Sequence, residues 1–179
     1  MSNNPLSHTM NATTLRALTH FPQELEAHYA AIPAAFKNWA PASWEGVPSE
    51  PFTPIEQICH IRDIEIDGYH VRFHRILHES NPTLASIDSE TLAKEKSYAA
   101  SNAAEVFAEF RETRTRTAEL ISELSPEQLA RTAVFEGYGE LSLRSLVHYL
   151  CSHDQQHLAG LQWLLGKIEA SRGPFKAID

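Results

Sequence analysis

The segment from Ser142 to about Ile168 constrains the fold most, because its apolar residues recur with the period of an α-helix. On a helical wheel of about 100° per residue, one arc collects the apolar side chains Leu143, Leu146, Val147, Leu150, Leu161, Leu164, Leu165 and Ile168. Such an arc is typical of a long helix that turns one face to a protein core. We therefore predict a long amphipathic helix that begins at Ser142 and packs against other helices.

Three further segments carry helix signals, at about residues 13–38, 54–79 and 102–124. The second has the clearest start, because Thr53 is a good N-cap residue, Pro54 suits the first helical position and Glu56 completes a capping box. Pro22 either opens the main part of the first helix or kinks it. Together with the C-terminal helix, these segments predict an all-α fold, a four-helix bundle with an antiparallel or crossover arrangement.

The connections between the predicted helices are long. A Pro- and Ser-rich stretch, APASWEGVPSEPF, leads into the second helix, and residues 81–100 form a loop of mixed polarity without a clear period. A short helical turn is expected at residues 125–128, and the stretch around Gly137 and Gly139 suits a pair of strands. No linker or repeat divides the sequence, so we predict one domain over residues 1–179, with a loose tail of about ten residues at the N-terminus.

Charge and hydropathy narrow the partners of the chain. There are 23 Asp and Glu against 15 Lys and Arg, a net charge of −8, which disfavours nucleic acid as a partner. No apolar run approaches the roughly 20 residues that span a membrane, and the polar N-terminus does not have the pattern of a signal peptide. Cys59 and Cys151 lie in apolar helical patterns, which indicates reduced thiols. We expect a cytoplasmic protein that acts on a small molecule, and a homodimer is compatible with the sequence.

Two histidines interrupt the apolar arc of the C-terminal helix. His153 and His157 lie between Leu150 and Leu161, and because they are four residues apart their rings lie one turn above each other. A buried imidazole without a partner costs about 1–3 kcal/mol, and a shared metal ion would satisfy both rings. A hydrogen-bonded pair inside the bundle and a pair at a wet rim are the alternatives. A metal site needs a third ligand from another helix.

The second helix offers several candidates for that ligand. His60 lies within the apolar run ICHI, whereas His70, His74 and His78 form a ladder with one turn between successive members. A solvated or groove-lining face is the simpler interpretation of this ladder. Spacing alone leaves the choice between His60 and His74 open.

Several charged residues lie on or beside the same helix faces. Asp63 and Asp67 lie on the His60 side, where they suit a catalytic base or a support for a ligand, although ordinary solvated positions are more common. Glu65, Arg114 and Asp154 fall on apolar arcs, and a buried charge needs a partner. We predict that Arg114 meets Glu65, with Asp154 as the alternative partner of Arg114 or as a support for a ligand histidine. In the other interpretation, Arg114 and Glu65 both reach solvent.

Three sequence segments resemble the DinB-like (damage-inducible) superfamily, which includes bacillithiol-dependent transferases and mycothiol-dependent maleylpyruvate isomerase. The segments are FTPIEQICHIRDIEIDGY, AEFRETRTRTAELISEL and LSLRSLVHYLCSHDQQHLAGL, within a resemblance that extends over about residues 18–165. The resemblance implies a four-helix bundle that holds one divalent metal ion through one histidine of the second helix and two of the last. At the matching positions these ligands are His60, His153 and His157.

Three imidazole ligands leave a coordination position for water or substrate, as in catalytic metal sites. Zn²⁺ or Ni²⁺ suits such a set, with Fe²⁺ as a third candidate. The resemblance implies a metal-dependent thiol S-transferase, with a low-molecular-weight thiol as co-substrate. A metal-dependent hydrolase or isomerase, a metal-binding stress protein without turnover and a helical interaction module are the alternatives. Residues 81–100 and the turn at Gly137 and Gly139 are expected to shape access to the site.

Overall fold

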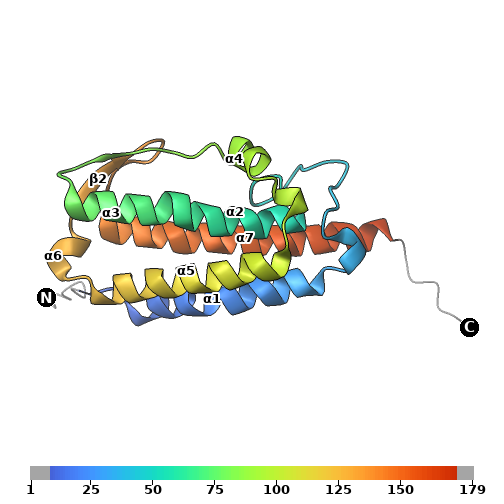
Figure 1. Cartoon of the computed structure of the whole chain (residues 1–179), viewed down its shortest axis with the longest axis horizontal. Coiled ribbons are helices and arrows are strands. Elements are labelled where there is room, and N and C mark those ends of the chain that lie inside the picture. The colour runs from blue at the N-terminus through green and yellow to red at the C-terminus, as the bar shows by residue number, and fades with distance from the viewer. Residues whose placement is uncertain (1–8, 173–179) are drawn as a thin grey trace, which may run out of the picture.

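The structure is a computed structural model that describes residues 9–172, so the expected N-terminal tail lies largely outside the described residues. Four long helical units lie side by side: α1 (Ala12–Ala31), a second unit over residues 54–78, α5 (Ala103–Glu123) and α7 (Leu143–Ser171). α1 and α7 run in one direction, and the second unit and α5 run in the other (Figure 1). Because the second unit and α5 are parallel, a crossover connection joins them. The predicted four-helix bundle is confirmed.

Side-chain caps set the starts of the helices where the sequence predicts them. The Thr53 N–H donates to the Glu56 carboxylate at 2.9 Å, and this capping box opens the second helical unit. The Asn102 side chain accepts the first amides of α5, and the Ser142 hydroxyl accepts an amide at the start of α7. Ser125 caps the predicted short turn, α6 (Pro126–Leu129). Local capping chemistry therefore sets the helix starts.

The first helix ends well before its expected limit at residue 38. α1 stops at Ala31, because Ile32 precedes Pro33 and a residue before proline is pushed to an extended conformation. Ile32 accordingly has ψ 127°, and a short 3₁₀ turn, η1 (Ala34–Phe36), follows. Pro22 lies inside the helix.

The second helical unit is not one uniform α-helix. α2 (Pro54–Asp63) continues into a π-helical segment, η2 (Ile64–His70), and then into α3 (Val71–His78). A π-helix is hydrogen-bonded from i to i+5, so it absorbs an additional residue relative to an α-helix. The side chains of α3 are therefore rotated relative to those of α2, compared with a continuous α-helix.

Residues 81–100 are not the loop that their sequence predicts. They contain the short strand β1 (Thr83–Leu84), the helix α4 (Ser89–Glu95) and the 3₁₀ turn η3 (Tyr98–Ala100). Asp88 caps α4 by accepting the amide of Thr91 at 3.0 Å. α4 and η3 both pack against α2. An element as short as α4 shows too little of the helical period to be recognised from sequence.

A small sheet lies at the end of the bundle where α7 begins (Figure 1). β2 (Thr132–Phe135) and β3 (Gly139–Ser142) form the predicted pair of strands, which is antiparallel, and β1 pairs with β2 in parallel. Gly137 and Gly139 have φ of +82° and +80°, left-handed values that glycine adopts without strain at the turn. The fold is thus mostly helical with one small sheet, which an all-α expectation leaves out.

A network of charged side chains, Arg114, Glu65 and Asp154, lies in the core beside its apolar residues. Arg114 binds the Asp154 carboxylate at 2.8 and 2.9 Å and the Glu65 carboxylate at 2.9 Å. Their residues are 1%, 2% and 1% exposed, respectively. The guanidinium also lies 5.0 Å from the rings of Phe21 and Phe110. The predicted Arg114–Glu65 pair is confirmed, and Asp154 joins it as a second partner.

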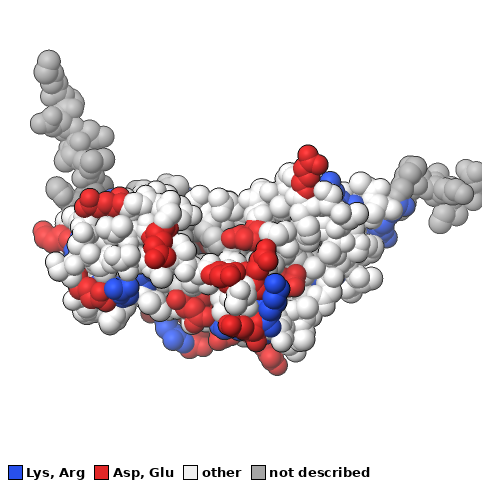
Figure 2. All heavy atoms as spheres, turned by 90° about the horizontal axis from the view of Figure 1, so that it is seen from above, with Lys and Arg blue, Asp and Glu red and all other residues white. Residues whose placement is uncertain are grey.

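The surface charge agrees with the acidic composition of the chain. Figure 2 shows acidic side chains scattered over the face that carries the sheet and α4, with basic side chains among them in a few places. None of the described helices combines the length and the apolar character needed to cross a membrane. Cys59 and Cys151 are both free thiols.

Candidate metal centre

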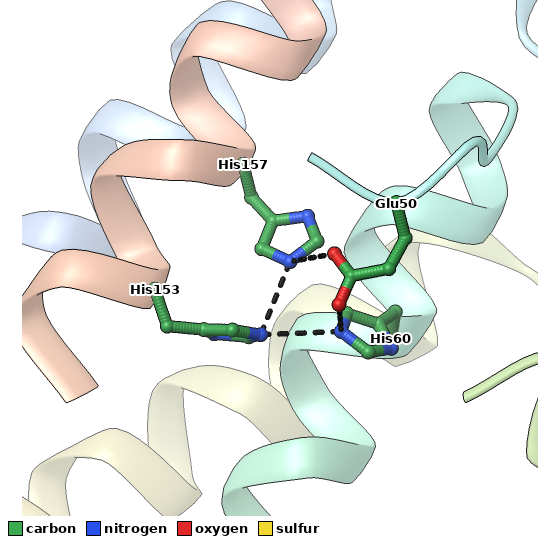
Figure 3. A group of neighbouring side chains, drawn as sticks. All are labelled: Glu50, His60, His153 and His157. Carbon is green, nitrogen blue, oxygen red and sulfur yellow. Dashed lines mark hydrogen bonds and ion pairs between the residues drawn. The ribbon is translucent and has the colours of Figure 1, made fainter. Parts of the chain in front are cut away.

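Three histidines and one glutamate converge from different parts of the chain. His60 comes from α2, His153 and His157 come from successive turns of α7, and Glu50 lies in the connection before α2 (Figure 3). One donor atom from each residue lies within 4.8 Å of all the others. The structure thus brings together the three histidines named from the resemblance and adds a carboxylate to them.

The donor atoms face one another at short range. The Nε2 atom of His153 lies 3.2 Å from that of His60 and 3.1 Å from that of His157. One carboxylate oxygen of Glu50 lies 3.2 Å from His157 Nε2, and the other lies 3.7 Å from His60 Nε2. Four ligands around a zinc ion at about 2.0–2.1 Å would be about 3.3 Å apart, so the spacing fits a small divalent ion.

Gln57 fixes the tautomer of one of these rings. Its side-chain amide donates to the backbone carbonyls of Glu50 and Phe52, which orients its own carbonyl oxygen towards His157. His157 Nδ1 donates a short hydrogen bond to that oxygen, so in the neutral ring Nε2 carries a lone pair into the cluster. Gln57 is fully buried. A partner of this kind is what a metal-binding histidine ordinarily has on its second nitrogen.

Hydrogen bonds among the three rings cannot pair all three of their Nε2 atoms. Because His157 Nε2 is an acceptor, only His60 and His153 can donate within the cluster. His153 Nε2 lies near both other rings, yet a single N–H serves one neighbour. His60 Nδ1 is buried and has no hydrogen-bond partner among the described residues. A cation between the Nε2 atoms would let all three lone pairs act together, and His60 Nδ1 would then hold the proton of the neutral ring.

Burial and neighbouring groups keep two of the rings, those of His60 and His153, in the neutral form that binds metal. Burial, together with the neighbouring His157, lowers the pKa of His60 to about 3. Burial and the other two histidines lower the pKa of His153 well below its ordinary value. Burial alone would raise the pKa of Glu50, but its contacts with His157 and His60 lower it. At neutral pH His60 and His153 are therefore neutral imidazoles beside an ionised carboxylate, the ligand forms that a divalent cation requires.

Two residues of the site, Glu50 and Gln57, are not predicted from the sequence. Glu50 lies in the Pro- and Ser-rich connection, where no helical period links it to a histidine. Gln57 could have been recognised, since it precedes His60 by three residues and shares its helix face. A third feature is Gly160 on α7, where an added Cβ would lie 2.4 Å from the Ser49 hydroxyl that binds the Gln57 amide. The glycine thus leaves room for the support of His157.

The acidic candidates on the second helical unit and on α7 lie outside the cluster. Asp63 is buried and binds Arg62 at 2.8 and 3.0 Å, and the exposed Asp67 pairs with Lys96. Asp154 binds Arg114, as described above, and is not hydrogen-bonded to a ligand histidine.

The histidine ladder divides into two parts. His70 is half-buried, and its Nε2 bonds the Thr117 hydroxyl at 2.7 Å. His74 and His78 are exposed, with ring centroids 4.5 Å apart. None of the three joins the cluster, and only His74 and His78 agree with the expected solvated face.

A pocket of about 260 Å³ adjoins the cluster. His60, His153 and Glu50 form one part of its lining, and Arg72, Tyr69 and Tyr149 form another. The wall is completed by Ser86 and Ile87 before α4, by Phe135 at the end of β2 and by Tyr138 in the turn between β2 and β3. The two segments expected to shape access to the site therefore both line it.

The fold and the site together define a class of protein: a helical bundle with a histidine-rich cluster beside a pocket. The sequence profile of the DinB superfamily matches residues 17–161, and the chain belongs to this superfamily. A search of curated proteins found no match.

Among solved structures, YfiT from Bacillus subtilis is similar. The two structures superpose with a TM-score of 0.76 over 90% of this chain and 91% of that one, at 17% sequence identity. YfiT is described as a probable metal-dependent hydrolase with an unusual four-helix bundle topology. At this level of identity the likeness supports the fold, and the four-helix architecture agrees.

Proposed function

We propose that this chain is an enzyme that uses one divalent metal ion, held by His60, His153 and His157, to act on a small molecule. The observation that carries the proposal is the convergence of three Nε2 atoms and one carboxylate beside a pocket. We propose Zn²⁺ or Ni²⁺ as the ion, because imidazole ligands suit both, with Fe²⁺ as the next candidate. A bound ion would supply Lewis acidity, which lowers the pKa of a water molecule or a thiol and so produces a nucleophile near neutral pH.

Glu50 differs from the three histidines in its setting. Its side chain is 38% exposed and belongs to a connection, whereas the histidine rings are fixed on helices. We assign it the role of a base that accepts the proton of the nucleophile, since its carboxylate lies beside the cluster and is ionised. The histidines then hold the metal, and Glu50 serves the reaction.

Hydrolysis is the reaction that the pocket favours. A volume of about 260 Å³ lies near the lower end of small-molecule sites and accommodates one small substrate more easily than a thiol and an electrophile together. Water as the nucleophile needs little of this space. The description of YfiT as a probable metal-dependent hydrolase points the same way. Thiol S-transfer is the second candidate, which the sequence resemblance to the bacillithiol and mycothiol enzymes supports.

Metal content tests the ligand assignment. Purified wild-type protein should contain close to one divalent ion per chain by elemental analysis. The His60→Ala, His153→Ala and His157→Ala variants should each lose most of it, whereas His74→Ala, an exposed histidine of α3, should retain it. Full metal content in His60→Ala together with loss in His74→Ala would show that the assignment is wrong.

The role of Glu50 separates catalysis from simple metal storage. If Glu50 acts as the base, Glu50→Gln should keep its metal and lose turnover. If Glu50→Gln loses the metal as completely as a histidine variant does, the carboxylate is a fourth structural ligand. A site closed in this way would favour a metal-binding protein without turnover.

The reaction itself requires a substrate panel. Metal-loaded and chelated protein should be assayed with small hydrolysable esters and amides, and in parallel with small thiols and electrophiles. Metal-dependent hydrolysis that is absent in His153→Ala would support the proposal. Metal-dependent conjugation of a thiol instead would identify the transferase.

A further inference from the structure

A buried arginine lines the same pocket without a carboxylate partner. Arg72 is 6% exposed, and its Nε and Nη2 donate to the Ala85 carbonyl at 3.4 and 3.0 Å. Its guanidinium carbon lies 4.5 Å from the Phe135 ring and 5.4 Å from the Tyr69 ring. Within the described part of the chain, neither an acidic side chain nor any acceptor contacts its Nη1. Arginine is seldom buried to this degree without an anion.

The remaining buried arginine of the bundle shows what such a group ordinarily requires. Arg114 is 1% exposed and binds two carboxylates. Arg72 has only one carbonyl oxygen and two aromatic faces, which compensate a desolvated charge incompletely. A neutral carbonyl would be a sufficient anchor for a structural arginine at the surface, but Arg72 lies in the wall of a pocket. The missing anion therefore has a place to bind.

The π-helical segment directs Arg72 to the metal centre. Arg72 follows His60 by twelve residues (72 − 60), which places the two side chains about 120° apart on a continuous α-helix. The segment η2 lies between them and absorbs an additional residue. The spacing then behaves as eleven residues, about three full turns, so both side chains share one face. Gly68 leaves space beside Arg72, because an added Cβ there would lie 2.9 Å from Nη1.

We propose that the pocket binds a small organic anion, whose carboxylate or phosphate group pairs with Arg72 while its reacting group lies at the histidine cluster. The planar guanidinium suits the paired oxygens of either group. The hydroxyls of Ser89 and Tyr138 line the same pocket and can supplement these bonds. The placement of the reacting group rests on the proposed function, whereas anion binding by Arg72 does not. The surface around the sheet and α4 carries mostly acidic side chains (Figure 2). It would not attract an anion by itself, so the preference for an anion would come from Arg72 inside the pocket.

Calorimetric titration of the full chain tests the proposal, with succinate, inorganic phosphate and neutral succinamide as probes. Both metal-loaded and chelated protein should be titrated. We expect succinate or phosphate to bind the wild type at least about tenfold more tightly than succinamide does. Arg72→Met should weaken anion binding by about 10- to 100-fold, and Arg72→Lys, which retains the charge without the planar fork, should fall between. Whichever of succinate and phosphate binds more tightly identifies the anionic group.

Arg75→Met is the matched control. Arg75 lies on the same helix, pairs with Glu79 at 2.7 Å and does not line the pocket, so its loss should leave anion affinity unchanged. Metal content and the far-UV circular dichroism of each variant show whether it is folded and loaded.

The outcomes separate the two proposals. Anion binding that is as strong in Arg72→Met as in the wild type would overturn the inference, as would equal affinity for succinamide or no affinity for either anion. A wild type that takes up no metal would refute the proposed function, and the titrations of chelated protein would still decide the role of Arg72.

Discussion

Replacement of Arg114 by methionine should destabilise the bundle severely. Methionine retains much of the length of the side chain but leaves the Glu65 and Asp154 carboxylates in the core without their cation. Each carboxylate belongs to a residue at most 2% exposed, so water does not replace the lost bonds. Removal of one partner from a buried ion pair costs about 3–5 kcal/mol. For a protein of this size that corresponds to a fall in melting temperature of about 6–20 °C.

Urea unfolding of the metal-free protein at pH 7, followed by far-UV circular dichroism, measures this loss as a shift in midpoint at constant slope. Arg116→Met is the matched control on the same helix. Arg116 pairs with Glu112 at the surface, with side chains 62% and 69% exposed, so its loss should cost about 0–0.5 kcal/mol.

The cost of Arg114→Met should arise from the uncompensated charges rather than from packing. Glu65→Gln and Asp154→Asn, added to Arg114→Met, should therefore recover part of the lost free energy of unfolding. A loss below about 1 kcal/mol in Arg114→Met, or a triple variant less stable than the single one, would refute this reasoning.

Three further predictions concern the site and its surroundings. Chelation should lower the melting temperature, because metal at about 100 times its Kd would stabilise the native state by about 2.7 kcal/mol. The melting temperature of His153→Ala should not change on addition of chelator. Gly160→Ala should displace the Ser49 hydroxyl and with it Gln57, and so weaken metal affinity by about tenfold in competition with a chromophoric chelator; Gly166→Ala, whose added Cβ meets nothing within 4 Å, should not. Burial alone would raise the pKa of Asp63, but its cationic partners hold that pKa below its ordinary value. The ionised Asp63 side chain thus contributes fully to the free energy of unfolding above the ordinary pKa of an aspartate. This contribution is lost as the pH falls below that value. The free energy of unfolding should therefore fall more steeply between about pH 5 and 3 in the wild type than in Asp63→Asn.

The sequence is informative wherever the determining interaction is local. Thr53 and Ser142 cap helices through residues three positions away, so their role can be recognised directly. His153 and His157 are one turn apart on one helix, and this geometry follows from the helical period. The choice of His60 over His74 as the third ligand rests on the family resemblance, because spacing on the second helical unit suits both residues.

The remaining parts of the site depend on contacts between distant segments or on irregular backbone. Glu50 reaches the cluster through the path of a connection, which no periodicity describes. Arg72 faces the pocket only because η2 breaks the α-helical register, and a wheel drawn for a continuous α-helix places it elsewhere. The short helix α4 and strand β1 are stabilised by packing on α2 and by pairing with β2, interactions that a local pattern does not contain.

The π-helical segment also allows the histidine cluster and the pocket wall to change independently. Loss of one residue between Ile64 and His70 would restore a continuous α-helix and rotate everything after it by about 100° relative to His60. The histidines would keep their places, while a different side chain would face the pocket where Arg72 now lies. If the proposed function and the proposed role of Arg72 hold, a relative with the same histidines and one residue fewer in this stretch should bind the same metal and lose the preference for an anion.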